Sequence, residues 1–469
     1  MDRLQRLLGA TVDIRSFRPT YFPYAGYVAE GVTFRRQLSP GAPEIPFITV
    51  ERLTIQSSYL GLFRKPHILR LVLAEGLHAE IPGSGMNLTS HKSGKSDPVV
   101  AEEFRVENGE LAITSSERGH KPLVFNVHSA RFLNLGTDRT IAFSSTLHIP
   151  EPPGEAETHG WLGPFATGDG SMRRTPINGS YVLRGADLGH YKSLMGILSS
   201  QGEFSGTLAD LSVNGLTISP DFGVRESRHH FRVAIRFSGL VDLKSGDVVI
   251  QSLKADLGKT TLSGTARIAG KPKAIELDVA HGQGQVEDLV LLFSDAPRSA
   301  IAGPISFSTK AALPAGEGPF KERVRLTGEF NIDPAHFTSE HTQHSVDKLS
   351  AEAQGEHSEL AEDNEAVSNL QGHVVLENGI ARFSQITFRV PGAAASMAGT
   401  YSLLNKRVKF DGKMRMQAKL SQATTGAKSV FLKLLDPFYK KKNAGAELPV
   451  QMDGVYGHTH FSVGLKAKK

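Results

Sequence analysis

Residues 408–420 read VKFDGKMRMQAKL, and this stretch decides the fold class. Apolar or small residues alternate with charged or polar ones along its whole length, which is typical of a β-strand with one face in water. Thirteen residues at about 3.3 Å each extend about 43 Å, longer than the usual strand. The large apolar residues on its uncharged side are Val408, Phe410, Met414, Met416 and Leu420.

The same alternation recurs upstream, in residues 231–237 and 305–313. The sequence therefore predicts a mainly β protein with a few short helices, whose long sheet must bury its apolar face against a second sheet or inside a curled sheet. Further candidates for lining this face are Phe231, Val233, Ile235 and Phe237.

Glycines occupy the apolar side of several of these strands, as in Leu262-Ser-Gly-Thr-Ala-Arg-Ile268 and Met397-Ala-Gly-Thr-Tyr-Ser-Leu403. A missing side chain there permits bending or the close approach of another group. Asn108-Gly109 and Asn378-Gly379 each lie between apolar runs, the strongest short signal for a hairpin. The copies are irregularly spaced, unlike those of a propeller.

Four short helices are expected, at residues 2–8, 188–198, 286–293 and 426–435. Two stretches rich in Gly, Ser or Pro, residues 83–96 and 150–176, are expected to be irregular. They divide the chain into an N-terminal β section (1–82), a short β section flanked by loops (83–176) and a C-terminal β-groove section (177–469).

The charge is unevenly distributed, although the net charge is only +5. Residues 401–469 carry 14 basic and 4 acidic side chains, whereas the middle of the chain is acidic. A basic end on a near-neutral body fits an anionic membrane surface, and we expect no nucleic-acid partner. There is no cysteine, which excludes disulfides and thiolate chemistry.

Motifs for catalysis or cofactors are weak. Gly94-Lys95-Ser96 lacks the first glycine of a phosphate-binding loop, since position 89 is Thr89. His336, Glu340, His341 and His344 could be pictured around a metal, but their segment is polar throughout. With no nucleophile elbow either, we expect no catalytic residue, no cofactor and no metal.

The segment 426–435, GAKSVFLKLL, is amphipathic and has two interpretations. It could lie in a membrane surface with its lysines at the headgroups, or it could cap the open end of a sheet. The membrane-surface candidates are Val430, Phe431, Leu434, Leu435, Lys440, Lys441 and Lys442.

The chain resembles the AsmA-like proteins of bacterial envelopes, relatives of the bridge-like lipid-transfer proteins that have a repeating β-groove. The resemblance rests on residues 372–399 (GHVVLENGIARFSQITFRVPGAAASMAG), 410–420, 425–442 and 448–461. Residues 202–221, 246–263 and 12–80 also look like this family. Gly454-Val455 and His460-Phe461 stand where the family typically has Gly-Thr and Pro-Phe.

The resemblance implies a long curved antiparallel sheet that forms a groove, apolar inside and polar outside, and the apolar residues named above in 408–420 and 231–237 are the candidates for binding lipid in it. It also implies a protein that moves or organises envelope lipids in the periplasm and is associated with the inner membrane. The family's anchor helix is not seen here, and residues 1–8 look like the segment that follows it. We therefore expect a non-catalytic protein that binds phospholipid or another acyl lipid and serves lipid transport or outer-membrane homeostasis. A structural envelope protein with a closed core and a glycan-binding or glycan-acting β protein remain the alternatives.

Overall fold

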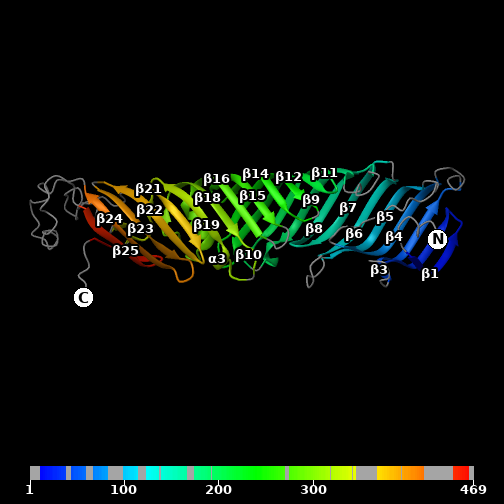
Figure 1. The fold of residues 1–469 in the computed structure, drawn as a ribbon, viewed down its shortest axis with the longest axis horizontal. Helices are drawn as coiled ribbons and strands as arrows, with labels where there is room; N and C mark the ends of the chain where they lie inside the picture. The colour runs from blue at the N-terminus through cyan, green and yellow to red at the C-terminus, as the bar shows by residue number, and fades with distance from the viewer. Residues whose placement is uncertain are drawn as a thin grey trace, which may run out of the picture. The chain divides into compact units, whose positions relative to one another are not determined.

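The protein is mainly β, as expected from the alternating sequence pattern. Strands account for 76% of the structure and helices for 6%, and 24 strands form one mostly antiparallel sheet that is not closed (Figure 1). The computed structural model describes residues 11–37, 44–59, 67–82, 99–114, 123–136, 139–165, 174–191, 193–243, 245–269, 274–316, 318–340, 342–344, 367–391, 393–416 and 447–463.

The chain divides into two compact units. Unit 1 comprises residues 1–191, 196–220 and 236–249, and unit 2 comprises residues 192–195, 221–235 and 250–469. Strands β12 (Asp210–Val224), β13 (Phe231–Asp242) and β14 (Val248–Leu257) contribute residues to both units.

Unit 1 contains neighbouring strands that pair antiparallel except for β4 and β5, which run parallel. Its small cores include Val32, Phe34 and Val50. Its other elements are β1 (Thr11–Thr20), β2 (Ala25–Gln37), β3 (Glu44–Ser57), β4 (His67–Pro82), β5 (Val99–Thr114), β6 (Leu123–Leu135), β7 (Ile141–Pro150), β8 (Pro153–Leu162), β9 (Pro176–Asp187), the 3-10 helix η2 (Leu188–His190) and β11 (Ile197–Thr207).

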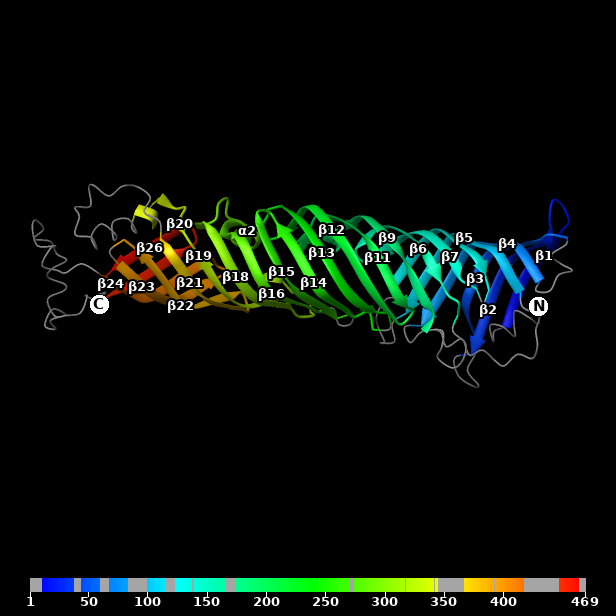
Figure 2. The ribbon, with the colours of Figure 1, turned by 90° about the horizontal axis from the view of Figure 1, so that it is seen from above.

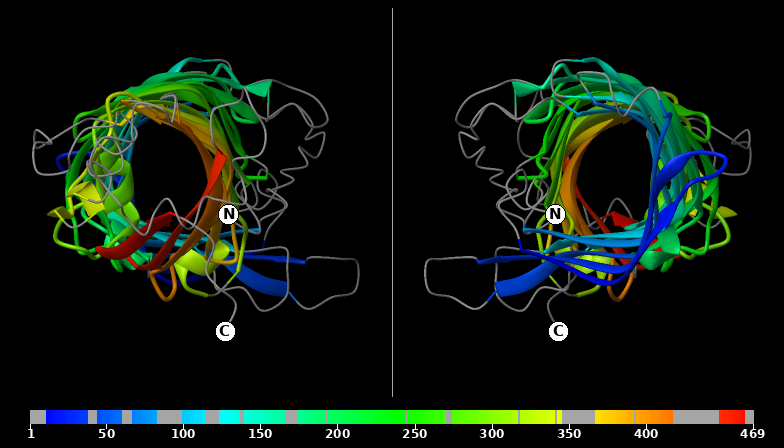
Figure 3. Two further views of the ribbon diagram at one scale, coloured as in Figure 1. Left: turned by 90° about the vertical axis from the view of Figure 1, so that its left-hand side faces the viewer. Right: turned by 90° about the vertical axis from the view of Figure 1, so that its right-hand side faces the viewer.

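Unit 2 continues as an antiparallel series in the order β15, β16, β18, β19, β21, β22, β23, β24, β25, β26. The ribbon of these strands curves (Figure 3). Its elements are β10 (Leu194–Met195), β15 (Thr260–Ala269), β16 (Ala274–Gln285), α2 (Val286–Phe293), β17 (Ile301–Ala302), β18 (Pro304–Leu313), α3 (Phe320–Arg323), β19 (Arg325–Ile332), β20 (His336–Phe337), β21 (Ser368–Glu377), β22 (Ile380–Val390), β23 (Ala393–Ser402), β24 (Arg407–Met416), β25 (Glu447–Val455) and β26 (His458–Val463).

The helix expected at 286–293 is confirmed as α2, whereas the one expected at 188–198 is wrong. That segment forms the short η2 and then the strands β10 and β11. Asp187 accepts a hydrogen bond from the backbone N–H of Gly189, which starts the turn. Gly196, at φ 116°, then takes a backbone conformation that a continuing helix excludes.

The expectation of an irregular stretch over 150–176 is also wrong in part, because it contains strand β8. The residues Glu155, Glu157 and His159 point to one side of this strand and pair with β7 and β9. Within β8, proline occurs only at the first residue, where its missing N–H does not interrupt the hydrogen bonds between strands.

The two Asn-Gly pairs behave differently. Asn378 and Gly379, both at positive φ, turn the chain between β21 and β22, as expected of a hairpin. Asn108 also has positive φ, but Gly109 lies inside the continuous strand β5, between β4 and β6. The second expected hairpin is therefore wrong, and the pair marks an irregularity within a strand instead.

Candidate functional site

One face of the sheet in unit 2 carries no charged side chain among its described residues. The register aligns Ile332 with Leu370, Phe383 with Gly399 and Phe410 with Met452, so that apolar or small residues face each other across successive strands. We call this the uncharged face. It includes Leu277, Val279, Gly282, Ile305, Phe307, Thr309, Ala311, Leu326, Gly328, Phe330, Ile332, Leu370, Gly372, Val374, Leu376, Ala381, Phe383, Ile386, Phe388, Val390, Ala393, Ala395, Met397, Gly399, Tyr401, Val408, Phe410, Gly412, Met414, Val450, Met452 and Gly454.

The opposite side of the same strands is charged, and we call it the charged face. Lys409 pairs with Asp453, Lys413 lies across from Ser396, and Arg382 lies across from Thr400. Because successive side chains of a strand point to opposite sides, all the charged side chains of these residues lie on one side of the sheet.

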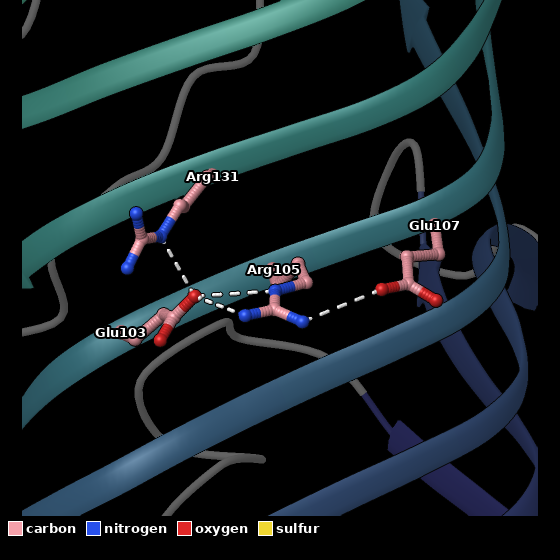
Figure 4. Close-up of polar contacts among 4 residues, drawn as sticks. All are labelled: Glu103, Arg105, Glu107 and Arg131. Atoms are coloured by element: carbon pink, nitrogen blue, oxygen red, sulfur yellow. Dashed lines mark hydrogen bonds and ion pairs between the residues drawn. The ribbon is translucent and has the colours of Figure 1, made fainter.

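Unit 1 places ion pairs on its strands in a similar way. Glu103 on β5 accepts hydrogen bonds from Arg105, at 2.6 Å, and from Arg131 on β6, at 2.8 Å (Figure 4). These two hydrogen bonds lower the pKa of Glu103. Arg105 also lies 3.6 Å from Glu107, so the carboxylates and guanidinium groups form a short chain. Such solvent-accessible pairs contribute little to stability, and they leave this side of the strands polar.

Three of the predicted lipid-binding residues lie together on the uncharged face. Val408 and Met414 are buried there, at 8% and 3% exposure, and Phe410 is half-buried. Met416 pairs with Ala393, next along the same strand, and Leu420 lies outside the described residues. The other candidates, Phe231, Val233, Ile235 and Phe237, alternate along β13 and are all half-buried.

Phenylalanine rings cover glycines on neighbouring strands of the uncharged face. A Cβ at Gly399 would lie 2.5 Å from Cδ1 of Phe410, and one at Gly282 would clash with the ring of Phe307. Ring centroids lie 6.1 Å apart between Phe330 and Phe383, and 5.5 Å apart between Phe383 and Phe410. Gly399 and Gly282 thus each admit a ring from the adjacent strand, whereas a Cβ at Gly264 would meet the backbone of Asp278.

A second layer covers part of the uncharged face. Val286, Leu289 and Val290 of α2 and Phe337 of β20 pack in the same cluster as Met414 and Val450. Figure 2 shows α2 and β20 beside the strands of unit 2. At the other end of the strands, Phe320 of α3 packs against Leu326 and stacks on Phe293, with a centroid distance of 5.9 Å. The sequence analysis foresaw α2 but not that it would lie on this face.

In unit 1 the corresponding face includes hydroxyl groups. The Tyr181 hydroxyl lies 3.2 Å from Ser200 Oγ, and Thr217 donates a hydrogen bond of 2.9 Å to the same oxygen. Gly202 on β11 lies across from Tyr181 itself, and Gly160 on β8 lies across from Gly179 on β9. These hydroxyls satisfy one another, so they add polarity to the face without adding charge.

Burial, together with the neighbouring Tyr456 and Asp295, raises the pKa of Tyr401, at the edge of the uncharged face, to about 12. Because an unfolded tyrosine titrates near 10, the folded protein is expected to lose stability as the pH rises from about 10 to 12. Tyr401→Phe removes this contribution, so urea midpoints measured across this range should fall less in the variant than in the wild type. An equal fall in both proteins would contradict this assignment.

No group of three or more metal-ligating side chains occurs within the described residues. Of the histidine cluster considered above, His336 pairs through its backbone in β20, and His341 lies outside the described residues. No described helix is both long and apolar enough to cross a membrane. The segment 426–435 and Lys440, Lys441 and Lys442 lie outside the described residues, so their membrane role stays a prediction.

Comparison with known proteins gives no match: no family model, no curated protein and no solved structure is similar to the chain.

Proposed function

We propose that this protein is a non-catalytic lipid-binding protein of the bacterial envelope, associated with the inner membrane on its periplasmic side. It holds acyl chains of phospholipid or another lipid against the uncharged face and serves lipid transport or outer-membrane homeostasis. The resemblance to the AsmA-like proteins favours this function, and the residues of the sheet support it independently.

The observation that carries the proposal is the absence of charge from one face of the paired strands β16 to β26, within the described residues. Burying one methylene stabilises a complex by about 0.8 kcal/mol, so an acyl chain of about a dozen carbons gains about 10 kcal/mol before the cost of ordering it. No specific polar contact is required, and such a face would select ligands mainly by their width.

Contacts within unit 2 support a curved sheet with this face inside. Asp295, just after α2, forms an ion pair of 2.7 Å with Lys406 in the turn between β23 and β24. The Ala300 N–H donates a hydrogen bond of 2.7 Å to the Tyr456 hydroxyl, in the turn between β25 and β26. In a flat sheet, β16 and β23 would stand about 24 Å apart, at about 4.8 Å for each step between strands.

The half-buried rings of the uncharged face favour an open lining. Phe307, Phe330, Phe383 and Phe410 touch the core but are not themselves buried. Covering these half-buried rings with another apolar group is favourable, because it removes apolar surface from water. Native mass spectrometry of the purified full chain is expected to detect bound phospholipid, and delipidation followed by incubation with phosphatidylcholine vesicles should restore it.

A structural envelope protein is the second candidate, and the packing of one cluster favours it. Val450 is 0% exposed, and Met414 and Met397 are 3% and 6% exposed, so this part of the interior is filled by the protein's own side chains. If the filling extended along the whole face, no lipid would be detected before or after incubation with vesicles. That result would reject lipid binding and leave the structural role.

A membrane-surface contact is supported by exposed aromatic side chains around the turn between β1 and β2. We call them the aromatic turn: Phe17, Tyr21, Phe22, Tyr27 and Tyr59. Phe22 is 91% exposed, and Phe17 stacks on Tyr27 with a centroid distance of 4.7 Å. Tyrosine and phenylalanine at a protein tip suit the boundary between headgroups and acyl chains.

Phe22→Ser is expected to weaken binding of the full chain to phosphatidylcholine–phosphatidylglycerol vesicles about tenfold, because it removes most of one apolar side chain from the interface. The measurement is co-sedimentation with vesicles. Trp161→Ser is the matched control, since Trp161 is 54% exposed but lies on β8. Equal losses in the two variants, or none in either, would contradict the contact.

A further inference from the structure

The charged face of unit 2 contains a depression of about 660 Å³ over strands β21 to β25. Its floor is made of the short side chains of Ala394 and Ser396 on β23, and longer side chains stand on either side. Its lining residues on the charged face are Asn369, Gln371, Thr387, Arg389, Ala394, Ser396, Lys413, Arg415 and Glu447, and Phe388 and Ala395, which belong to the uncharged face, also line it.

The strand register places two arginines on either side of one alanine. Arg389 on β22 pairs with Ala394, and Ala394 pairs with Arg415 on β24. The two arginine backbones are therefore two strand spacings apart, about 10 Å. Because alanine leaves the space above β23 empty, both guanidinium groups can reach one ligand lying over it. Lys413 lies in the next row, across from Ser396.

The charges of this depression are not balanced. Its single carboxylate, Glu447, lies across from Arg415 and 3.9 Å from the Nζ of Lys413, in a loose and exposed pair. Neither Arg389 nor Arg415 has an ion-pair partner among the described residues, whereas Arg325 on the same face lies 3.6 Å from Glu377. Three cations against one anion leave a net charge of +2 in the depression.

We propose that this depression binds a phosphate group, as the free ion or as part of a lipid headgroup. Two guanidinium groups match the oxygens of a phosphate through paired N–H donors, and Lys413 adds a third positive charge. The hydroxyls of Thr387 and Ser396 and the amide of Gln371 supply neutral donors around the ligand. The site lies on the opposite side of the strands from the uncharged face and does not depend on lipid binding there.

The test uses the full chain and two double variants of equal charge. Arg389→Gln with Arg415→Gln removes the two guanidinium groups of the depression. Arg382→Gln with Arg407→Gln is the matched control, because these arginines are exposed, lie on the same strands β22 and β24, and do not line the depression. Circular dichroism and melting temperature establish that all three proteins are folded.

Isothermal titration with inorganic phosphate is expected to give saturable binding to the wild type and the control, weakened about tenfold or more in the Arg389/Arg415 variant. Co-sedimentation with vesicles of phosphatidylcholine alone, and of phosphatidylcholine with phosphatidic acid, identifies the source. Loss of phosphatidic-acid-dependent binding in the same variant assigns a lipid headgroup, and unchanged vesicle binding assigns the free ion. Equal weakening in both variants, or no saturable binding of either probe to the wild type, would overturn the site.

Discussion

Phe410→Asp is expected to remove bound phospholipid from the purified protein, with a loss of tenfold or more in lipid per chain. An unpaired carboxylate on the uncharged face would have to be desolvated beneath an acyl chain, which costs several kcal/mol. Phe410 suits this test better than Met414, because Met414 is 3% exposed and an aspartate there would disrupt the core. Lipid is measured by native mass spectrometry and by extraction.

Thr400→Asp is the matched control on the other side of the sheet. Thr400 lies across from Lys409 and from Arg382, so an aspartate there meets cations and leaves the uncharged face unchanged. In β13, Phe237→Asp and Ser238→Asp form a second pair on adjacent residues, one half-buried and one exposed. Unchanged lipid content in folded Phe410→Asp and Phe237→Asp proteins would contradict the account.

Gly282→Val is expected to destabilise the protein by about 2 to 3 kcal/mol, because the new side chain must occupy the space of the Phe307 ring. Phe307→Ala alone should also destabilise the protein, through the loss of packing. The two changes together should cost less than the sum of the single losses, since each relieves the other. The free energy of unfolding of the four proteins, in a double-mutant cycle, measures this coupling.

A coupling energy near zero would contradict the packing of Phe307 over Gly282. A coupling of about 1 kcal/mol or more would support it.

The strands were predictable from the sequence because their alternation is local. The pattern in residues 408–416 follows directly from the period of two, and the register then places Phe410 beside Gly399 and Met452. The sequence could not show which of Asn378-Gly379 and Asn108-Gly109 turns the chain, because both pairs lie between apolar runs. In the structure, the asparagine of each pair has positive φ. The difference lies in the partners, because the residues around Asn108 are held between β4 and β6.

Contacts between segments that lie far apart in the chain could not be predicted from the sequence. Nothing in the residues around Asp295 indicates a pairing with Lys406, more than a hundred residues away. The depression around Arg389 and Arg415 was missed for the same reason, because Ala394 separates them only after the strands are paired. The sequence held one signal for this depression. Charged residues alternate along β22 and β24, whereas β23 between them carries small residues on the same side.

Photo-crosslinking with a diazirine-bearing fatty acid tests most directly whether the uncharged face holds acyl chains. After irradiation of the full chain, peptide mapping should place the label on residues such as Phe410, Phe383 and Phe330. Lys409 and Glu329, the neighbours on the opposite side of the same strands, should stay unlabelled. Labelling confined to the charged face, or no saturable labelling, would contradict the account.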